Sequence, residues 1–242
     1  MIWGNFTILH IITLIFALLI NFILYLVIKK LSKQNQIFIL TCLSFLGIGA
    51  IIYNLLAWNS PLEYLPLHLC SLNALILPIC IIRQNNRLAN LLILWSLGAL
   101  VALIINNSVS NTNILGFTFF FYYFPHVFEC GIPIIMLKLD LYKLEKKYIF
   151  STLLITFTSY TLIHFINVFI NNYCTMNNIL NNNYEVVKVN YMFSIYPDNP
   201  FLQFLYNLLP YSYFYMLLCF PIIALYLIII YSFANKKNNN ML

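Results

Sequence analysis

Charged residues are scarce in this chain of 242 residues. Asp, Glu, Lys and Arg make up 7% of the sequence, and hydrophobic residues make up 62%. A globular protein has about 25% charged and about 45–50% apolar residues. A soluble fold of this length cannot cover its surface with so few charges, so the composition predicts a protein that crosses a membrane several times.

Several sequence motifs are also missing, and their absence narrows the function. The six cysteines form no Cys-x-x-Cys pair, which excludes the usual zinc and haem spacings. Five of them lie in apolar runs and only Cys174 lies in a polar segment, a pattern that does not predict a disulfide framework. The net charge of +6 comes from basic residues that form no dense patch, so we expect no nucleic-acid partner. No Lys or Arg precedes the first apolar run, which therefore predicts a retained span rather than a cleaved signal peptide.

Seven apolar stretches predict membrane-spanning helices, each of which needs about 20 apolar residues. They cover residues 6–28, 37–57, 65–82, 88–105, 115–137, 148–170 and 211–233. The third and fourth stretches are short. The predicted fold is an all-α transmembrane bundle of seven helices, forming a single domain over residues 1–242.

Basic residues alternate between the predicted loops and indicate the orientation of the chain. Eleven of the twelve Lys and Arg residues follow the first, third, fifth or seventh span, and only Lys188 lies elsewhere. By the positive-inside rule, the N-terminus is outside and the C-terminus inside. We therefore expect a multi-pass protein of the cell membrane. The eleven residues are Lys29, Lys30, Lys33, Arg83, Arg87, Lys138, Lys143, Lys146, Lys147, Lys236 and Lys237.

The segment between the sixth and seventh predicted spans is unlike the rest of the chain. Residues 171–190 are rich in Asn and predict an external loop. Residues 191–210 are aromatic and half apolar, and Pro197 and Pro200 interrupt them, so we interpret this part as interfacial or re-entrant.

Ionisable residues inside spans are costly and are therefore informative about function. In the fifth span, His126, Glu129 and Cys130 have the spacing i, i+3 and i+4, which places them on one helix face. His126 is predicted to lie about 16 Å along this helix, near the middle of the bilayer. Glu129 would favour the protonated imidazole or fix its tautomer. The alternative is a structural hydrogen-bond cluster between helices.

The third span carries a second set of polar residues. Cys70 and Asn73 share one face of this helix, whereas His68 points elsewhere or towards the outer interface. A buried cysteine is usually a small apolar residue with an unreactive thiol. A histidine on another span that acts as its base would make Cys70 a candidate nucleophile.

These residues resemble a known family. The sequence Leu67-His68-Leu69-Cys70 on the third of seven spans is similar to the signature of the YwaF-like family of bacterial integral membrane proteins. Asn190-Tyr191, Pro197, and Pro210 before the last span resemble the C-terminal pattern of that family, and His126 lies where the family has a histidine. The resemblance covers roughly residues 66–215.

The resemblance implies a reaction. YwaF-like proteins look related to a eukaryotic seven-span family that remodels membrane phospholipids by acyl transfer, with an intramembrane cysteine and histidine. Carried over, these two catalytic residues are Cys70 and His126, the partners are membrane phospholipids, and no metal or soluble cofactor is implied. In the expected mechanism Cys70 holds the acyl chain as a thioester and Asn73 stabilises the carbonyl oxygen. Glu129 orients His126, and His68 is a supporting residue.

Two other functions remain open from the sequence. A solute or proton transporter would use His126 and Glu129, with helices bent by proline around them. The chain has no internal repeat of the kind that such transporters usually show. A metal site is possible from ligand types alone, although the sequence spacing does not support it. Its ligands would be Cys70, His126, Glu129 and Cys130.

Overall fold

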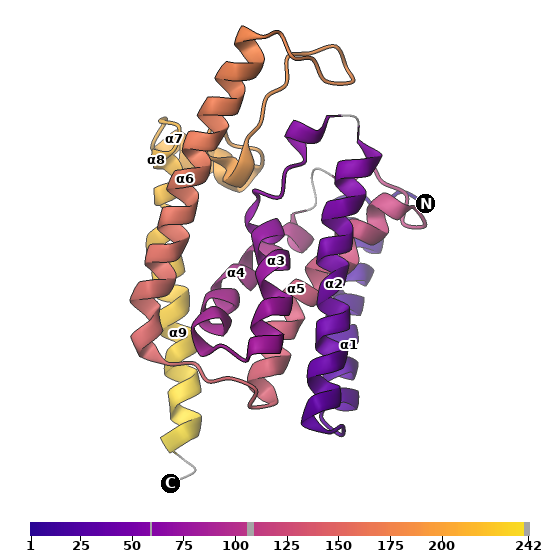
Figure 1. The fold of residues 1–242 in the computed structure, drawn as a ribbon, viewed down its shortest axis with the longest axis vertical. Helices are drawn as coiled ribbons and strands as arrows, with labels where there is room; N and C mark the ends of the chain where they lie inside the picture. Colours follow the sequence, from indigo (N-terminus) through magenta and orange to yellow (C-terminus); the bar gives the residue numbers. More distant parts are fainter. Residues whose placement is uncertain (59, 106–108, 240–242) are drawn as a thin grey trace. The chain divides into compact units, whose positions relative to one another are not determined.

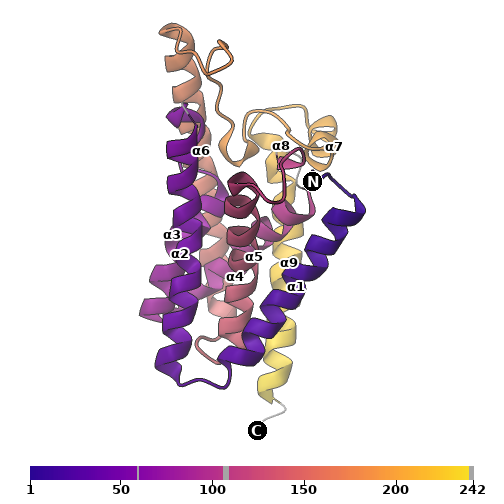
Figure 2. The ribbon, with the colours of Figure 1, turned by 90° about the vertical axis from the view of Figure 1, so that its right-hand side faces the viewer.

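The computed structural model describes residues 1–58, 60–105 and 109–232, and the backbone of 233–239. The chain forms two compact units. Unit 1 comprises Met1–Asn54 and Leu69–Lys143, and unit 2 comprises Leu55–His68 and Leu144–Leu242. Figures 1 and 2 show that the described residues form helices joined by irregular segments.

Six of the described helices are long and apolar enough to cross a membrane. A shorter apolar helix, α3, has 15 residues, and two further short helices lie between α6 and α9. The bounds are α1 Ile8–Ile28, α2 Lys33–Ala57, α3 Leu69–Arg83, α4 Asn86–Ile104, α5 Phe117–Lys138, α6 Ile149–Met176, α7 Pro200–Leu208, α8 Phe214–Leu217 and α9 Cys219–Asn239.

The helical fold predicted from the sequence is confirmed, but the count of seven spans is not. Helix α3 begins at Leu69 rather than at residue 65, so it rises only about 22 Å, against a hydrocarbon core of about 30 Å. Pro66 disfavours a helical conformation at Leu65, which accounts for the absence of helix at that residue. The N–H of Leu65 instead donates to the hydroxyl of Tyr191. The orientation of the termini stays a prediction.

Unit 1 is built around the packing of α3, α4 and α5, and α1 packs against α5. Helix α4 is central, since every residue from Ala89 to Ser96 is buried. At one end, the N-H of Trp3 donates to the carbonyl of Thr112, so the N-terminal segment pairs with the connection between α4 and α5. The side chain of Asn90, near the start of α4, donates to the carbonyl of Lys143, beyond the end of α5. The start of α4 and the end of α5 therefore lie at the same end of unit 1.

Unit 2 contains an asparagine clamp, formed by Asn167 and Asn171 of α6. The amide of Asn167 donates to the carbonyl of Tyr191 and accepts from its N–H, and Asn171 does the same with Val189. Four residues of helix rise about 6 Å and two residues of extended chain about 6.6 Å, so the two spacings match. The clamp holds the chain before Met192, whose φ of 52° is rare for a residue other than glycine.

The segment between α6 and α9 differs from the prediction in detail. Helix α6 continues to Met176, so residues 171–176 are helical, and Cys174 is 0% exposed instead of lying in a polar loop. Residues 191–210 contain a short 3-10 helix at Tyr191–Phe193 and then α7. Its interfacial position, and the external position of the loop before it, stay predictions. Helices α6 and α9 touch through Phe157 and Phe220.

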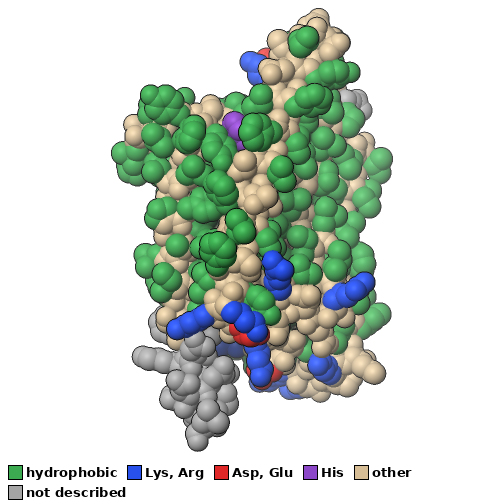
Figure 3. All heavy atoms as spheres, turned by 60° about the vertical axis from the view of Figure 1, so that its left-hand side comes forward, with side chains coloured by type: hydrophobic (Ala, Val, Ile, Leu, Met, Phe, Trp, Pro, Cys, Tyr) green, Lys and Arg blue, Asp and Glu red, His purple; other side chains and the backbone are tan. Residues whose placement is uncertain are grey.

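The exposed surfaces of the long helices are apolar. Most residues of α1 are exposed or half-buried, and its exposed side chains include Ile15, Phe22 and Val27. Hydrophobic side chains are spread over much of the face seen in Figure 3. Such a surface needs apolar surroundings, which a bilayer provides.

Candidate functional site

Helix α5 buries two ionisable side chains in unit 1. His126 is 8% exposed and Glu129 is 4% exposed, one helical turn apart. Cys130 is half-buried. Both buried groups therefore face the protein interior and not the surrounding lipid.

The orientation of His126 is set by its own helix. Its Nδ1 lies 2.6 Å from the backbone carbonyl oxygen of Tyr122, and this oxygen can only accept. Nδ1 therefore carries the proton, and in the neutral ring Nε2 keeps its lone pair. The ring of Tyr122 lies against the imidazole at 4.4 Å, and the hydroxyl of Tyr122 donates to the carbonyl of Ala102 in α4. The described hydrogen bond of His126 therefore goes to Tyr122, and an orienting role of Glu129 stays a prediction.

His10 provides a contrast within the same unit. Its Nδ1 accepts from the N–H of Phe6 at 3.0 Å, and its Nε2 lies 2.8 Å from the carbonyl oxygen of Leu103. Both nitrogens are occupied, and the residue is fully buried. His10 is thus a structural histidine, whereas no described residue bonds to Nε2 of His126.

Helix α3 contributes Cys70 and Asn73 to the same unit. Cys70 lies in the first turn of α3 and is half-buried, and Asn73 lies one turn further on and is 0% exposed. The sulfur of Cys70 lies within electrostatic range of Glu129 and of the hydroxyl of Tyr122. Glu129 thus lies within electrostatic range of Cys70 and His126 and beside Asn73, all in unit 1.

Several polar atoms at this site have no hydrogen-bond partner among the described residues. They are both amide atoms of Asn73 and Oε2 of Glu129. The amide of Asn73 lies beside the carboxyl group of Glu129, but no hydrogen bond of ordinary geometry joins them. Buried polar atoms are normally paired, so this set has spare capacity to bind a polar group.

Gly47 of α2 closes this side of the site. A Cβ atom at residue 47 would lie 2.7 Å from the Cβ of Ala74 and 3.2 Å from Oε1 of Glu129. Only glycine lets α2 approach α3 and the carboxyl group so closely. Gly47 and Tyr122 were not among the predicted site residues, although the Gly-Ile-Gly run in α2 and the i−4 position before His126 mark them in the sequence.

His68, the remaining predicted supporting residue, has its described contacts within its own unit. His68 belongs to unit 2, where its Nδ1 accepts from the N–H of Met192 and its ring packs on Tyr191 and Phe193. Among the described residues, no group of three or more His, Cys, Asp or Glu side chains could hold a metal ion. That finding does not support the four-ligand metal site.

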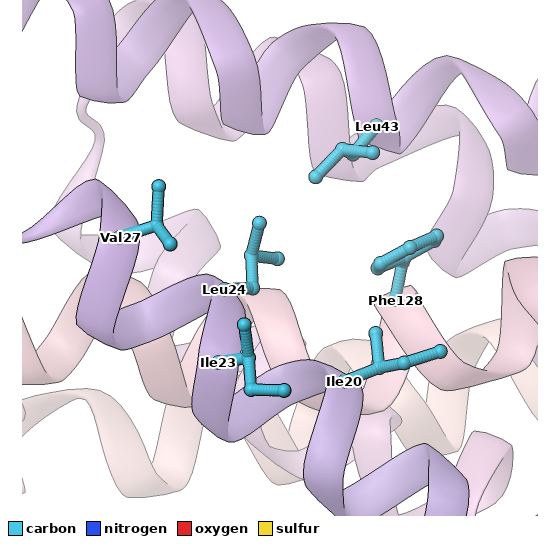
Figure 4. Close-up of a pocket in the computed structure, with 6 residues that line it drawn as sticks. All are labelled: Ile20, Ile23, Leu24, Val27, Leu43 and Phe128. Carbon is cyan, nitrogen blue, oxygen red and sulfur yellow. The ribbon is translucent and has the colours of Figure 1, made fainter.

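An apolar groove of about 290 Å³ lies in unit 1 between α1, α2 and α5. Figure 4 shows its lining side chains, which are all hydrocarbon. Phe128, at one side of the groove, directly precedes Glu129 in α5. The lining residues are Ile20, Ile23, Leu24, Val27, Leu43 and Phe128.

The long apolar helices and the lipid-compatible surface define a multi-pass α-helical membrane protein with buried ionisable residues. The family model of the TMEM164 family matches residues 3–231. The chain therefore belongs to the TMEM164 family, and the match includes every residue of the candidate site. No curated protein and no solved structure shows a significant match to the chain.

Proposed function

We propose that this protein transfers acyl chains between membrane phospholipids, with Cys70 as nucleophile and His126 as general base. The observation that carries the proposal is the state of His126, which is buried, oriented by the carbonyl of Tyr122 and left with a basic Nε2. Cys70 lies in the same unit. The resemblance to the YwaF-like family supports the same pair of residues.

In the first half-reaction, Nε2 of His126 takes the thiol proton of Cys70, and the sulfur attacks the ester carbonyl carbon of a donor phospholipid. The C–O bond of the ester then breaks. The leaving oxygen receives the proton from His126, and the acyl chain remains on Cys70 as a thioester.

In the second half-reaction, the free hydroxyl of an acceptor lipid gives its proton to His126, and its oxygen attacks the thioester. The C–S bond breaks, and the thiolate regains the proton. In both steps Nδ2 of Asn73, which has no described partner, would donate to the carbonyl oxygen as negative charge develops. The groove beside Phe128 has the apolar lining that a hydrocarbon chain needs.

The proposal is tested with purified protein, donor and acceptor phospholipids, and lipid mass spectrometry. Cys70→Ala and His126→Ala should each lower acyl exchange by orders of magnitude, because residues that act as one unit lose activity together. Cys70→Ser should fold equally well and remain largely inactive. Cys42→Ala and Cys219→Ala are the matched controls and should change little.

The same experiment distinguishes the transporter alternative. A transporter would depend on Glu129 and His126, and Cys70→Ala would have little effect because it replaces one small side chain with another. Normal exchange in Cys70→Ala would overturn the enzyme mechanism. A trapped acyl thioester on Cys70 would support it directly.

A further inference from the structure

The burial of the Glu129 carboxyl group makes its ionised form costly, and the neighbouring groups do little to offset that cost. Its carboxyl group is buried among membrane-spanning helices, and Oε2 has no described hydrogen-bond partner. No described Lys or Arg side chain acts on it. A buried carboxylate without a cationic partner is very costly, so such a group is held as the neutral acid.

The groups that face the carboxyl group lead to the same conclusion. On its own helix, His126 and Cys130 lie within electrostatic range of it. On α3, Cys70 and Asn73 do, and the backbone of α2 lies close to it at Gly47. His126 is hydrogen-bonded to Tyr122 and not to Glu129. A negative charge on Glu129 would also repel a thiolate on Cys70 in this apolar environment.

We propose that Glu129 is a neutral carboxylic acid and that its O–H, together with Nδ2 of Asn73, forms a two-donor binding site for the carbonyl oxygen of a lipid ester. This inference rests on the proposed function for the reaction that the site serves. No covalent bond changes at Glu129, and its proton stays on the carboxyl group throughout. The role differs from that of a base or an orienting anion.

The ligand class follows from the number of donors. A neutral acid offers one O–H and the amide offers N–H groups, and both side chains have unpaired polar atoms at the site. An ester carbonyl oxygen has two lone pairs and no donor, so it matches this pair. Gly47 places no side-chain atom against the carboxyl group, although the backbone of α2 packs close to it. Two such donors would become stronger as the oxygen gains negative charge.

Substitutions at Glu129 separate a neutral donor from an anion. Glu129→Gln keeps a neutral hydrogen-bond donor of the same size, so acyl exchange should stay within about tenfold of the wild type. Glu129→Leu removes the donor, so exchange should fall by about 10²- to 10³-fold, as for the loss of one oxyanion-hole donor. The matched controls are Glu145→Gln and Glu145→Leu, since Glu145 lies in unit 2. If Glu129→Gln is as inactive as Glu129→Leu while both remain folded, the neutral-donor role is wrong.

Infrared spectroscopy tests the site without turnover. The spectrum of the wild type should contain a protonated-carboxyl band at neutral pH that Glu129→Gln removes. In the Cys70→Ala protein, the ester carbonyl band of a bound, ¹³C-labelled phospholipid should move to lower wavenumber. Adding Glu129→Leu should reduce that shift. Absence of the carboxyl band, or a shift that Glu129→Leu leaves unchanged, would overturn the inference.

These measurements also separate this inference from the proposed function. If both infrared results hold but the wild type exchanges no acyl chains, the carbonyl-binding site stands and the acyltransferase proposal fails. If exchange depends on Cys70 and His126 but the carboxyl band is missing, the acyltransferase stands and the neutral acid fails.

Discussion

Nδ1 of His126 donates to the backbone carbonyl oxygen of Tyr122 across 2.6 Å. A carbonyl cannot donate, so this single hydrogen bond selects one tautomer and leaves the Nε2 lone pair available. Because the partner is a backbone atom of the same helix, no side-chain substitution removes it. The tautomer of His126, with a free lone pair on Nε2, is therefore determined within α5.

The two buried histidines of unit 1 should respond differently to alanine. His126→Ala removes only a bond within its own helix, so the melting temperature should stay near that of the wild type while acyl exchange is lost. His10→Ala leaves the carbonyl of Leu103 and the N–H of Phe6 without partners, which should lower the free energy of unfolding by about 1–3 kcal/mol. Thermal unfolding in detergent and the lipid assay, run on both variants, check this. Equal effects of the two variants on both readouts would contradict it.

The close approach of α2 should make Gly47 intolerant of alanine. Gly47→Ala brings a Cβ within 2.7 Å of Ala74 and should lower the free energy of unfolding by about 1–3 kcal/mol, because α2 must move outward. Gly49→Ala is the control, since its Cβ would lie 3.5 Å from Cε1 of Phe121, an ordinary contact. Denaturation curves of the two variants test the difference. If Gly49→Ala proves the more damaging, the packing of α2 described above is wrong.

Gly131 and Asn21 should be energetically coupled. A Cβ at residue 131 would lie 1.8 Å from Oδ1 of Asn21, so Gly131→Ala must displace a side chain that donates to the carbonyl of Val127. We expect Gly131→Ala to be destabilising in the wild type and milder in an Asn21→Ala background, with a coupling energy of about 1 kcal/mol or more. A double-mutant cycle measures it, and additive effects would show that the two residues do not share this contact.

The asparagine clamp of unit 2 should contribute to its stability. Asn167→Leu leaves the buried N–H of Tyr191 without its partner and removes one of two donors to the Tyr191 carbonyl, the other being the N–H of Ser194. The free energy of unfolding should therefore fall by about 1–3 kcal/mol. Asn177→Leu is the control, because the amide of Asn177 bonds only to its own helix. Proteolysis of the segment before α7 should also become faster in Asn167→Leu alone. Unchanged proteolysis there would argue against the clamp.

The predicted orientation can be tested with introduced cysteines. Residue 182 is exposed, so the cysteine of Asn182→Cys should react with a membrane-impermeant thiol reagent on intact cells. The cysteine of Lys143→Cys should react only after the membrane is permeabilised. The native Cys174 should not react from either side because it is buried. The reverse labelling of the two introduced cysteines would reverse the topology.

Composition and periodicity were sufficient for the class of protein and the approximate position of the long helices. A low charge content and long apolar runs leave no other stable arrangement for the backbone in a bilayer. The same local rules failed at α3, which begins at Leu69 although the apolar run begins earlier in the sequence. They also failed at Cys174. Its asparagine-rich segment is typical of a loop, but α6 continues through it, and Asn171 hydrogen-bonds to the backbone of Val189. The helix spacing of Asn167 and Asn171 does not by itself name Tyr191 and Val189 as those partners.

The sequence by itself placed His126, Glu129 and Cys130 on one helix and Cys70 and Asn73 on another, since spacing along a helix is a local property. Which groups meet across helices is not local, and only the tertiary structure decided it. Packing paired His126 with the carbonyl of Tyr122, set Gly47 against Glu129, and left the polar atoms of Asn73 unpaired. Such contacts depend on how closely the helices pack, at the scale of an ångström. Residue spacing within one helix carries no information about that distance.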